Sequence, residues 1–263
     1  MSAREPTWRS ECGRVRLYCA SAFDVMPELR ADVVISDPPY ADRTHKGART
    51  NKLENAPAGY RCGGSKLVHF SAFTGDDFVN LCRLALKITR RWIVLTCDHR
   101  HAALTFDWPE HIRLGCWVKV CPMPQITGDR PGSGHESILF LHNVGKKRWN
   151  GGGRSAVYKA MVLKDPAICI QATQKPIELL SALCSDFSEE GETVLDPCMG
   201  SGTTGVACIK AGRKFIGIEI DRASFEAAKA RIIRELAQPY LPALAPGPAC
   251  VAPAPELWER EGK

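Results

Sequence analysis

Short apolar runs alternate with amphipathic segments along most of the chain, and this pattern predicts an α/β fold. An unbroken run of β-branched and other apolar residues is typical of a strand that is covered on both faces of a sheet. Strands are therefore predicted at residues 14–19, 32–36, 92–96, 113–120, 137–142, 193–196 and 214–220. The short spacing from one strand to the next is typical of a doubly wound sheet.

Apolar residues three and four positions apart predict the helices between these strands. The predicted helices cover residues 22–29, 76–88, 99–104, a segment that opens at 173, 203–212 and 222–236. Asp76 and Asp77 can cap the second helix, and Thr203 or Thr204 the fifth. Thr173 lies near the cap of the fourth, with Pro176 in its first turn, where the missing N–H of proline does no harm.

The predicted strand at 32–36 ends abruptly in Asp37-Pro38-Pro39-Tyr40. The two prolines fix φ and remove two backbone donors, so this loop offers carbonyl groups, a carboxylate and a flat ring. Such a loop can accept hydrogen bonds from an NH2 group and stack on a planar ring, which suits a nucleobase amine. Taken alone, the four residues fit an ordinary proline turn equally well.

A second informative stretch joins a predicted strand to a predicted helix, with the sequence Asp196-Pro197-Cys198-Met199-Gly200-Ser201-Gly202-Thr203-Thr204. Its two glycines allow a tight turn and a close approach to a ligand. The turn lacks the Gly-Lys-Ser/Thr ending of a triphosphate site and the third glycine of the dinucleotide fingerprint. Glu219 in the next strand lies where a Rossmann-type unit places the acidic group that binds ribose hydroxyls. These residues therefore predict a nucleoside site.

Composition narrows the class of protein. The 263 residues are 44% hydrophobic and 24% charged, which fits one α/β domain at 1–237, followed by a proline-rich tail at 238–263 that we expect to be extended. No run approaches the roughly 18 apolar residues of a membrane span, and the N-terminus has no signal-peptide core, so a cytoplasmic location is expected. The twelve cysteines form no CxxC pair, and no metal site is expected.

The net charge of +6 permits a polyanionic partner, but the positions of the charges are more informative than their sum. Two segments, at about 41–75 and 143–170, are rich in basic residues and are interpreted as insertions that contact nucleic acid. The predicted DNA-binding residues are Arg43, Lys46, Arg49, Lys52, Lys146, Lys147, Arg148 and Arg154. A solvated surface loop is the competing interpretation of both segments.

In this order, the Asp37–Tyr40 loop, Thr173-Gln174-Lys175-Pro176 and the Asp196–Thr204 turn resemble the amino-group DNA methyltransferases of the permuted β class. The resemblance implies a Rossmann-like methyltransferase fold with a circularly permuted motif order and a seven-stranded, mostly parallel sheet whose last strand is antiparallel. It also implies S-adenosylmethionine as the cofactor. The implied cofactor-binding residues are Thr173, Gln174, Lys175, Pro176, Asp196, Pro197, Gly200, Ser201, Gly202, Thr203 and Glu219. Ala20-Ser21 departs from the Gly-Asp pair common in the family, which concerns one cofactor contact.

The same resemblance implies double-stranded DNA as the partner and Asp37, Pro38, Pro39 and Tyr40 as the catalytic loop. A base that is flipped out of the duplex would stack on Tyr40, while Asp37 and the Pro38 carbonyl accept its amine hydrogens. Aspartate before Pro-Pro favours adenine N6 over cytosine N4, because members that act on cytosine usually have Ser-Pro-Pro. Cytosine N4, an RNA or protein-amide substrate and a catalytically inactive DNA-binding homologue are the alternatives.

Overall fold

The structure is a computed structural model that describes residues 4–41, 72–122, 129, 131–143, 145–162 and 174–238. Its strands are β1 Trp8–Arg9, β2 Val15–Cys19, β3 Val33–Ser36, β4 Trp92–Cys97, β5 His111–Val120, β6 His135–His142, β7 Val157–Met161, β8 Thr193–Asp196 and β9 Lys214–Glu219. Its helices are α1 Ala22–Val25, the 3-10 helix η1 Met26–Glu28, α3 Gly75–Ile88, α4 His99–Ala103, α5 Ile177–Phe187, α6 Thr203–Lys210 and α7 Arg222–Leu236.

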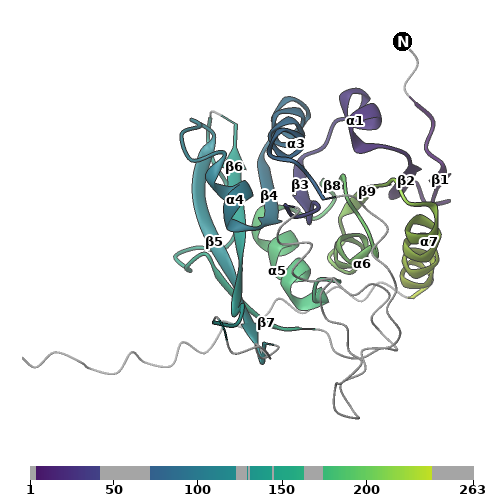
Figure 1. The fold of residues 1–263 in the computed structure, drawn as a ribbon. Helices are drawn as coiled ribbons and strands as arrows, with labels where there is room; N and C mark the ends of the chain where they lie inside the picture. Colours follow the sequence, from purple (N-terminus) through teal and green to yellow (C-terminus); the bar gives the residue numbers. More distant parts are fainter. Residues whose placement is uncertain are drawn as a thin grey trace, which may run out of the picture.

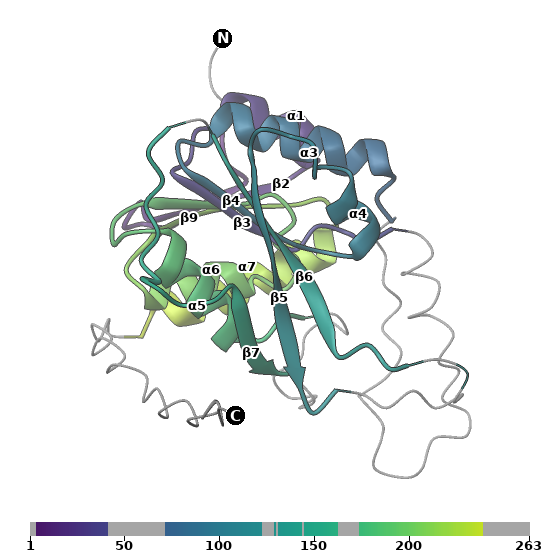
Figure 2. The same ribbon diagram turned by 90° about the vertical axis from the view of Figure 1, so that its left-hand side faces the viewer.

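One mixed sheet runs through the described residues, with the strand order β1-β2-β9-β8-β3-β4-β6-β5-β7. Strands β2, β9, β8, β3 and β4 pair in parallel, and β6 lies antiparallel between β4 and β5. Helices α1, α3 and α4 cover one face of the sheet, and α5, α6 and α7 cover the other (Figures 1 and 2). The structure confirms the predicted doubly wound α/β fold and all of the predicted strands.

The sheet has 9 strands rather than seven, because two edge strands were not predicted. Strand β1 has only 2 residues, too few to show a pattern. Strand β7 lies inside the segment that was interpreted as a basic loop, and this part of the prediction is wrong. Its residues alternate between exposed and buried, with Tyr158 and Ala160 buried, and it pairs in parallel with β5. The exposed Lys159 between them made this alternation look like a polar loop.

Helices α3, α5 and α6 begin with other caps than those predicted. The N-cap of α3 is Thr74, and Asp77 completes a capping box three residues later. The N-cap of α5 is Pro176, which therefore precedes the first turn. The N-cap of α6 is Gly202 rather than a threonine, because the chain turns into this helix through a left-handed conformation with φ of 73°.

Within the described ranges, no helix is long and apolar enough to cross a membrane. The same residues include no group of three or more His, Cys, Asp or Glu that could hold a metal ion. The tail predicted at 238–263 lies outside the description except for Gln238, so its extended state stays a prediction.

The parallel pairing of the central strands determines where the polar loops lie. Strand β3 has β8 on one side and β4 on the other, with Val34 opposite both Leu195 and Ile93. The carboxyl ends of these three strands therefore meet at one edge of the sheet, the edge at which open α/β sheets bind ligands. This edge carries Asp37, Asp196 and the residues that follow Cys97.

Helix α6 lies close to the sheet and to α7 because Gly205 has no side chain. A Cβ atom at this position would lie 2.7 Å from Cε1 of Phe215 and 2.8 Å from Cδ1 of Ile232. We expect Gly205→Ala to lower the free energy of unfolding by about 1–3 kcal/mol, because overpacking outweighs the gain of about 1 kcal/mol in helix propensity.

Urea unfolding followed by circular dichroism measures this difference. Gly153→Ala is the matched control, because a Cβ atom at Gly153 meets nothing within 4 Å. Equal stability of Gly205→Ala and the wild type would show that the packing of α6 is looser than the structure indicates.

Candidate active site

A cavity of about 1160 Å³ opens at the carboxyl edge of the parallel strands. Its walls come from segments that are distant in sequence. Three wall segments follow or precede an element: residues 20–23 after β2, 37–40 after β3 and 174–175 before α5. The others include the end of a strand, with residues 97–99 at β4, 196–201 at β8 and 219–221 at β9, or its start, with residues 135–137 at β6. The sheet topology therefore brings both predicted stretches into one site.

Asp37 follows β3 directly and is held by two neighbours. The hydroxyl of Thr96 donates a hydrogen bond to Oδ1 of Asp37, and Nζ of Lys175 lies 2.7 Å from Oδ2. Burial raises the pKa of Asp37, and the charge of Lys175 opposes this effect. A carboxylate has about four acceptor positions, so these contacts leave acceptor capacity for a ligand.

Tyr40 ends the same loop and is fixed through its hydroxyl group. The hydroxyl donates a hydrogen bond of 2.5 Å to Oε2 of Glu136, and Nζ of Lys175 lies 5.0 Å from the centre of the ring. Burial, followed by the charges of Asp37 and Glu136, raises the pKa of Tyr40, so the phenol stays protonated and can donate. The next residue is also held, because N–H of Ala41 donates to Oδ2 of Asp98 at 2.8 Å.

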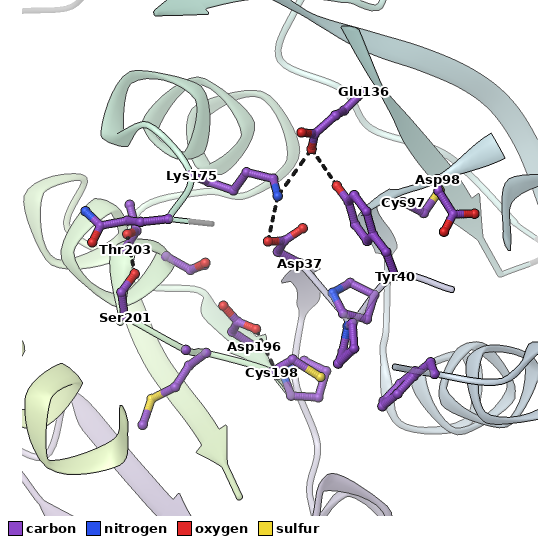
Figure 3. A pocket seen from close by; sticks show the side chains of 18 of the residues that line it. Asp37, Tyr40, Cys97, Asp98, Glu136, Lys175, Asp196, Cys198, Ser201 and Thr203 are labelled. Atoms are coloured by element: carbon purple, nitrogen blue, oxygen red, sulfur yellow. Dashed lines mark hydrogen bonds and ion pairs between the residues drawn. The ribbon is translucent and has the colours of Figure 1, made fainter. Parts of the chain in front are cut away.

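Glu136 lies between two lysines at the start of β6 (Figure 3). Its Oε1 is 2.8 Å from Nζ of Lys119, and its Oε2 is 3.2 Å from Nζ of Lys175. Burial alone would raise the pKa of Glu136, but the two ammonium groups outweigh it and lower this pKa to about 2. For Lys175, burial is likewise outweighed by the two carboxylates, which raise its pKa to about 12. Both groups are therefore charged at neutral pH.

The cavity has two halves: the first is formed around Asp37 and Tyr40, and the second around Asp196 and Glu219. In the second half, the hydrogen-bond partners of the carboxylates are neutral donors. Asp196 accepts a hydrogen bond of 2.6 Å from the hydroxyl of Ser36 and one of 3.0 Å from N–H of Cys198. Burial raises the pKa of Asp196 to about 6. Glu219 accepts from N–H of Gly200 at 2.9 Å and from N–H of Asp221 at 2.8 Å, and burial raises its pKa too.

Most of the predicted cofactor residues lie at this cavity. Those that line it are Gln174, Lys175, Asp196, Pro197, Gly200, Ser201, Thr203 and Glu219. Pro176 and Gly202 do not line the cavity but are the N-caps of α5 and α6, next to residues that do. Thr173 lies outside the described residues.

Two residues of the site, Thr96 and Asp98, were not predicted. Thr96 and Asp98 carry no sequence signal beyond their place at the end of a buried strand, where polar residues are common. Lys119 and Glu136 had a weak signal, because Trp117-Val118-Lys119 and His135-Glu136 match weaker features of the family that the sequence resembles. The role of each depends on contacts with residues far away in the chain, which periodicity does not report.

The basic segment after β6 lies away from the cavity. Because β6 runs antiparallel to β4, its last residue, His142, pairs with Trp92 at the amino end of β4. Lys146, Lys147, Arg148 and Arg154 follow from there, at the opposite edge of the sheet. Nε of Arg148 lies 3.2 Å from Oε1 of Glu189, and Arg154 forms an ion pair with Asp186 in α5. The predicted Arg43, Lys46, Arg49 and Lys52 fall outside the described residues.

Comparisons of the sequence with known proteins point to one family. The model of a family described as DNA methylase matches residues 31–230. The type II methyltransferase M.HinfI of Haemophilus influenzae is 25% identical over 244 residues, which cover 81% of this chain and 66% of that protein. The type II methyltransferase M2.DpnII of Streptococcus pneumoniae is 43% identical over 63 residues, 24% of each chain. The chain thus spans no more than about two thirds of the length of these relatives.

Solved structures give the same picture. The crystal structure of the M1.HpyAVI–SAM complex superposes with a TM-score of 0.59 at 27% identity, covering 82% of this chain and 99% of that one. The PvuII DNA methyltransferase, described as cytosine-N4-specific, superposes with a TM-score of 0.63 at 11% identity, covering 89% and 94%. At that identity, the second likeness concerns the fold alone.

The raised pKa of Asp196 predicts a dependence of stability on pH. Its pKa is 3.8 in the unfolded chain and about 6 in the fold. The protonated carboxyl group therefore contributes stability in full below the unfolded-state pKa, and this contribution is lost as the pH rises through the folded-state pKa. Asp196→Asn cannot ionise, and we expect its free energy of unfolding to exceed that of the wild type by up to about 3 kcal/mol at pH 8.

The difference in free energy of unfolding between the variant and the wild type should become small near pH 4. Urea unfolding at pH 4 and at pH 8 measures it. Asp107→Asn, at an exposed position, is the matched control. A wild type that equals or exceeds Asp196→Asn in stability at pH 8 would contradict the prediction.

Proposed function

The chain belongs to the N6/N4 DNA methylase family, and from that premise we propose that it transfers a methyl group from S-adenosylmethionine to the N6 amino group of adenine in double-stranded DNA. One observation carries the proposal. The Asp37–Tyr40 loop, which suits a nucleobase amine, and the Asp196–Thr203 turn, which suits a nucleoside, line the same cavity. Donor and acceptor of a transferred group can therefore meet there.

The residues of the second half of the cavity fit the cofactor. Its turn contains Gly200 and Gly202 with positive φ, and Gly200, which lines the cavity, has no side chain to keep a ligand from the backbone. Asp196 and Glu219 have only neutral donors as their hydrogen-bond partners given above, which suits a ligand with cationic groups and a ribose diol. When bound, S-adenosylmethionine supplies a methyl group on a positively charged sulfur. The complex of M1.HpyAVI with SAM supports this assignment at 27% identity.

The residues of the first half fit the base. The lone pair of the exocyclic amine is delocalised into the ring, which makes the amine a poor nucleophile. If Asp37 and the Pro38 carbonyl accept its two hydrogens, they favour a pyramidal nitrogen and stabilise the positive charge that grows on it during the transfer. Tyr40 provides a ring for stacking. A base in a duplex cannot reach this loop, so it must flip out at a cost of a few kcal/mol.

Adenine is proposed over cytosine on the basis of Asp37. Members of the family that act on cytosine usually have serine in this place, and Asp37 keeps acceptor positions for the amine of the base after its contacts with Thr96 and Lys175. The fold neighbour that is described as cytosine-N4-specific shares only 11% of its residues with this chain and carries no argument about the base.

Incubation with labelled S-adenosylmethionine and duplex DNA, followed by nucleoside analysis, tests the proposal. N6-methyldeoxyadenosine is the expected product, whereas N4-methyldeoxycytidine would overturn the assignment of the base. We expect Asp37→Ala to lower kcat by about a hundredfold or more, because it removes an acceptor for the charge that develops in the transition state. Competition with structured RNA checks the nucleic acid, and preferential methylation of RNA would overturn the DNA assignment.

The proposed role of Glu219 in binding the cofactor can be tested through the affinity for S-adenosylmethionine. If its carboxylate binds the ribose hydroxyls, Glu219→Gln should weaken the affinity for S-adenosylmethionine about tenfold, because it removes hydrogen bonds to a charged acceptor. Calorimetry measures this affinity. An analogue without the ribose 2′-hydroxyl should bind the wild type less well than the full cofactor, and the variant should discriminate less between the two. The control is Glu226→Gln, which changes an exposed ion pair with Arg222 on α7.

A further inference from the structure

We propose that Lys175 and Glu136 are positioning residues for the methyl transfer, which join the carboxylate of Asp37 to the ring of Tyr40 and hold the two in a fixed relation. The proposal rests on the proposed function. It places Lys175 on the side of the base, whereas the resemblance implied that this residue binds the cofactor.

The contacts form a closed ring (Figure 3). Nζ of Lys175 lies 2.7 Å from Oδ2 of Asp37 and 3.2 Å from Oε2 of Glu136. The same Oε2 atom accepts the hydrogen bond of 2.5 Å from the hydroxyl of Tyr40. The chain itself closes the ring from Asp37 to Tyr40, through two prolines whose φ angles are fixed. Neither Asp37 nor Tyr40 can change its orientation without breaking a charged contact.

The ring is anchored in three separate parts of the fold. Asp37 and Tyr40 follow β3, Glu136 belongs to β6, and Lys175 precedes α5. A fourth group, Lys119 of β5, lies 2.8 Å from Glu136 and keeps this carboxylate in place from the other side. The charges of two carboxylates and two ammonium groups then cancel, so the cluster as a whole is neutral.

The burial of these charges favours a functional role over a purely structural one. The side chain of Lys175 is only 8% exposed and that of Glu136 17%. Buried ion pairs lose much of their Coulomb energy to desolvation, and apolar residues in their place are often equally stable or more stable. Stability therefore gives little reason for such a network, whereas a reaction that requires fixed groups does.

The network also directs the hydrogen-bonding capacity of Asp37. Thr96 uses one position on Oδ1, and Lys175 uses one on Oδ2. The carboxylate keeps about two further acceptor positions for the amine of a base. Burial raises the pKa of Asp37, and the positive charge of Lys175 opposes this rise, so the ion pair favours the ionised carboxylate, the form that accepts hydrogen bonds at both oxygens.

Lys175→Met and Glu136→Gln test the proposal in the full chain. At saturating cofactor and DNA, both variants should transfer the methyl group about a hundredfold more slowly, the loss that follows from misplaced reacting groups. Their affinity for S-adenosylmethionine, measured by calorimetry, should stay within about threefold of the wild type. A residue that binds the cofactor, or that merely supports the fold, would change the affinity along with the rate.

The matched control is Lys210→Met. Lys210 pairs with Glu235 at 2.9 Å, its side chain is 48% exposed, and it does not line the cavity. We expect its methyl-transfer rate and its cofactor affinity to equal those of the wild type, because exposed ion pairs contribute little.

The double variant Lys175→Met/Glu136→Gln separates positioning from stability, because it removes one charge of each sign and so keeps the buried cluster neutral, whereas Lys175→Met alone leaves an excess negative charge. Its melting temperature should be higher than that of Lys175→Met, while its rate should stay about a hundredfold low. Recovery of the rate together with the stability would overturn the positioning role.

The outcomes also separate this proposal from the proposed function. A wild type that methylates no DNA would overturn both. An active wild type, with single variants that keep the wild-type rate or that lose cofactor affinity in proportion to the rate, would overturn the positioning role and leave the proposed function intact.

Discussion

The parallel pairing of β3 with β8 is the constraint on which the site depends. The two strands lie far apart in the sequence, yet their carboxyl ends lie side by side, and the hydroxyl of Ser36 donates to Asp196 across the pair at 2.6 Å. A shift in register would separate the two polar loops, and a shift by one residue would also turn every buried side chain to the opposite face. The apolar cores on both faces of the sheet, which include Val33 and Val34 on opposite sides, therefore fix the active-site geometry as well as the fold.

The buried carboxylates in the two halves of the cavity have different kinds of partners. On the side of Asp37, ammonium groups balance the carboxylates, and the local charge is close to zero. On the side of Asp196 and Glu219, the donors described above are neutral hydroxyl and N–H groups, and both pKa values are raised by burial. Negative charge is thus left where a cationic cofactor would bind, and it is neutralised where an uncharged base would bind.

The sequence predicted the elements well and the polar contacts poorly, for a physical reason. Strands such as β3 and β8 are apolar runs, and local pattern alone reveals them. The network of Asp37, Glu136 and Lys175 connects positions that are up to 138 residues apart, and it exists only after the sheet has formed. Strand β7 was missed because it has only 5 residues and lies within a stretch whose basic residues and glycines suggested a loop. The resemblance located Lys175 and implied a contact with the cofactor, which stays a prediction, but its ion pair with Asp37 became visible only in the structure.

Topology also separates two basic segments that look alike in composition. The segment 42–71 is flanked by Tyr40 and Ala72, which both line the cavity. The segment from Lys146 to Arg154 follows β6, which runs antiparallel to its neighbours β4 and β5, and begins at the far edge, where two of its arginines pair with Glu189 and Asp186. One reversal of strand direction thus moves a basic stretch from the ligand edge to the opposite edge. Charge composition indicates that a chain can bind a polyanion, but strand direction decides which of its basic segments start at the edge of the sheet that carries the cavity.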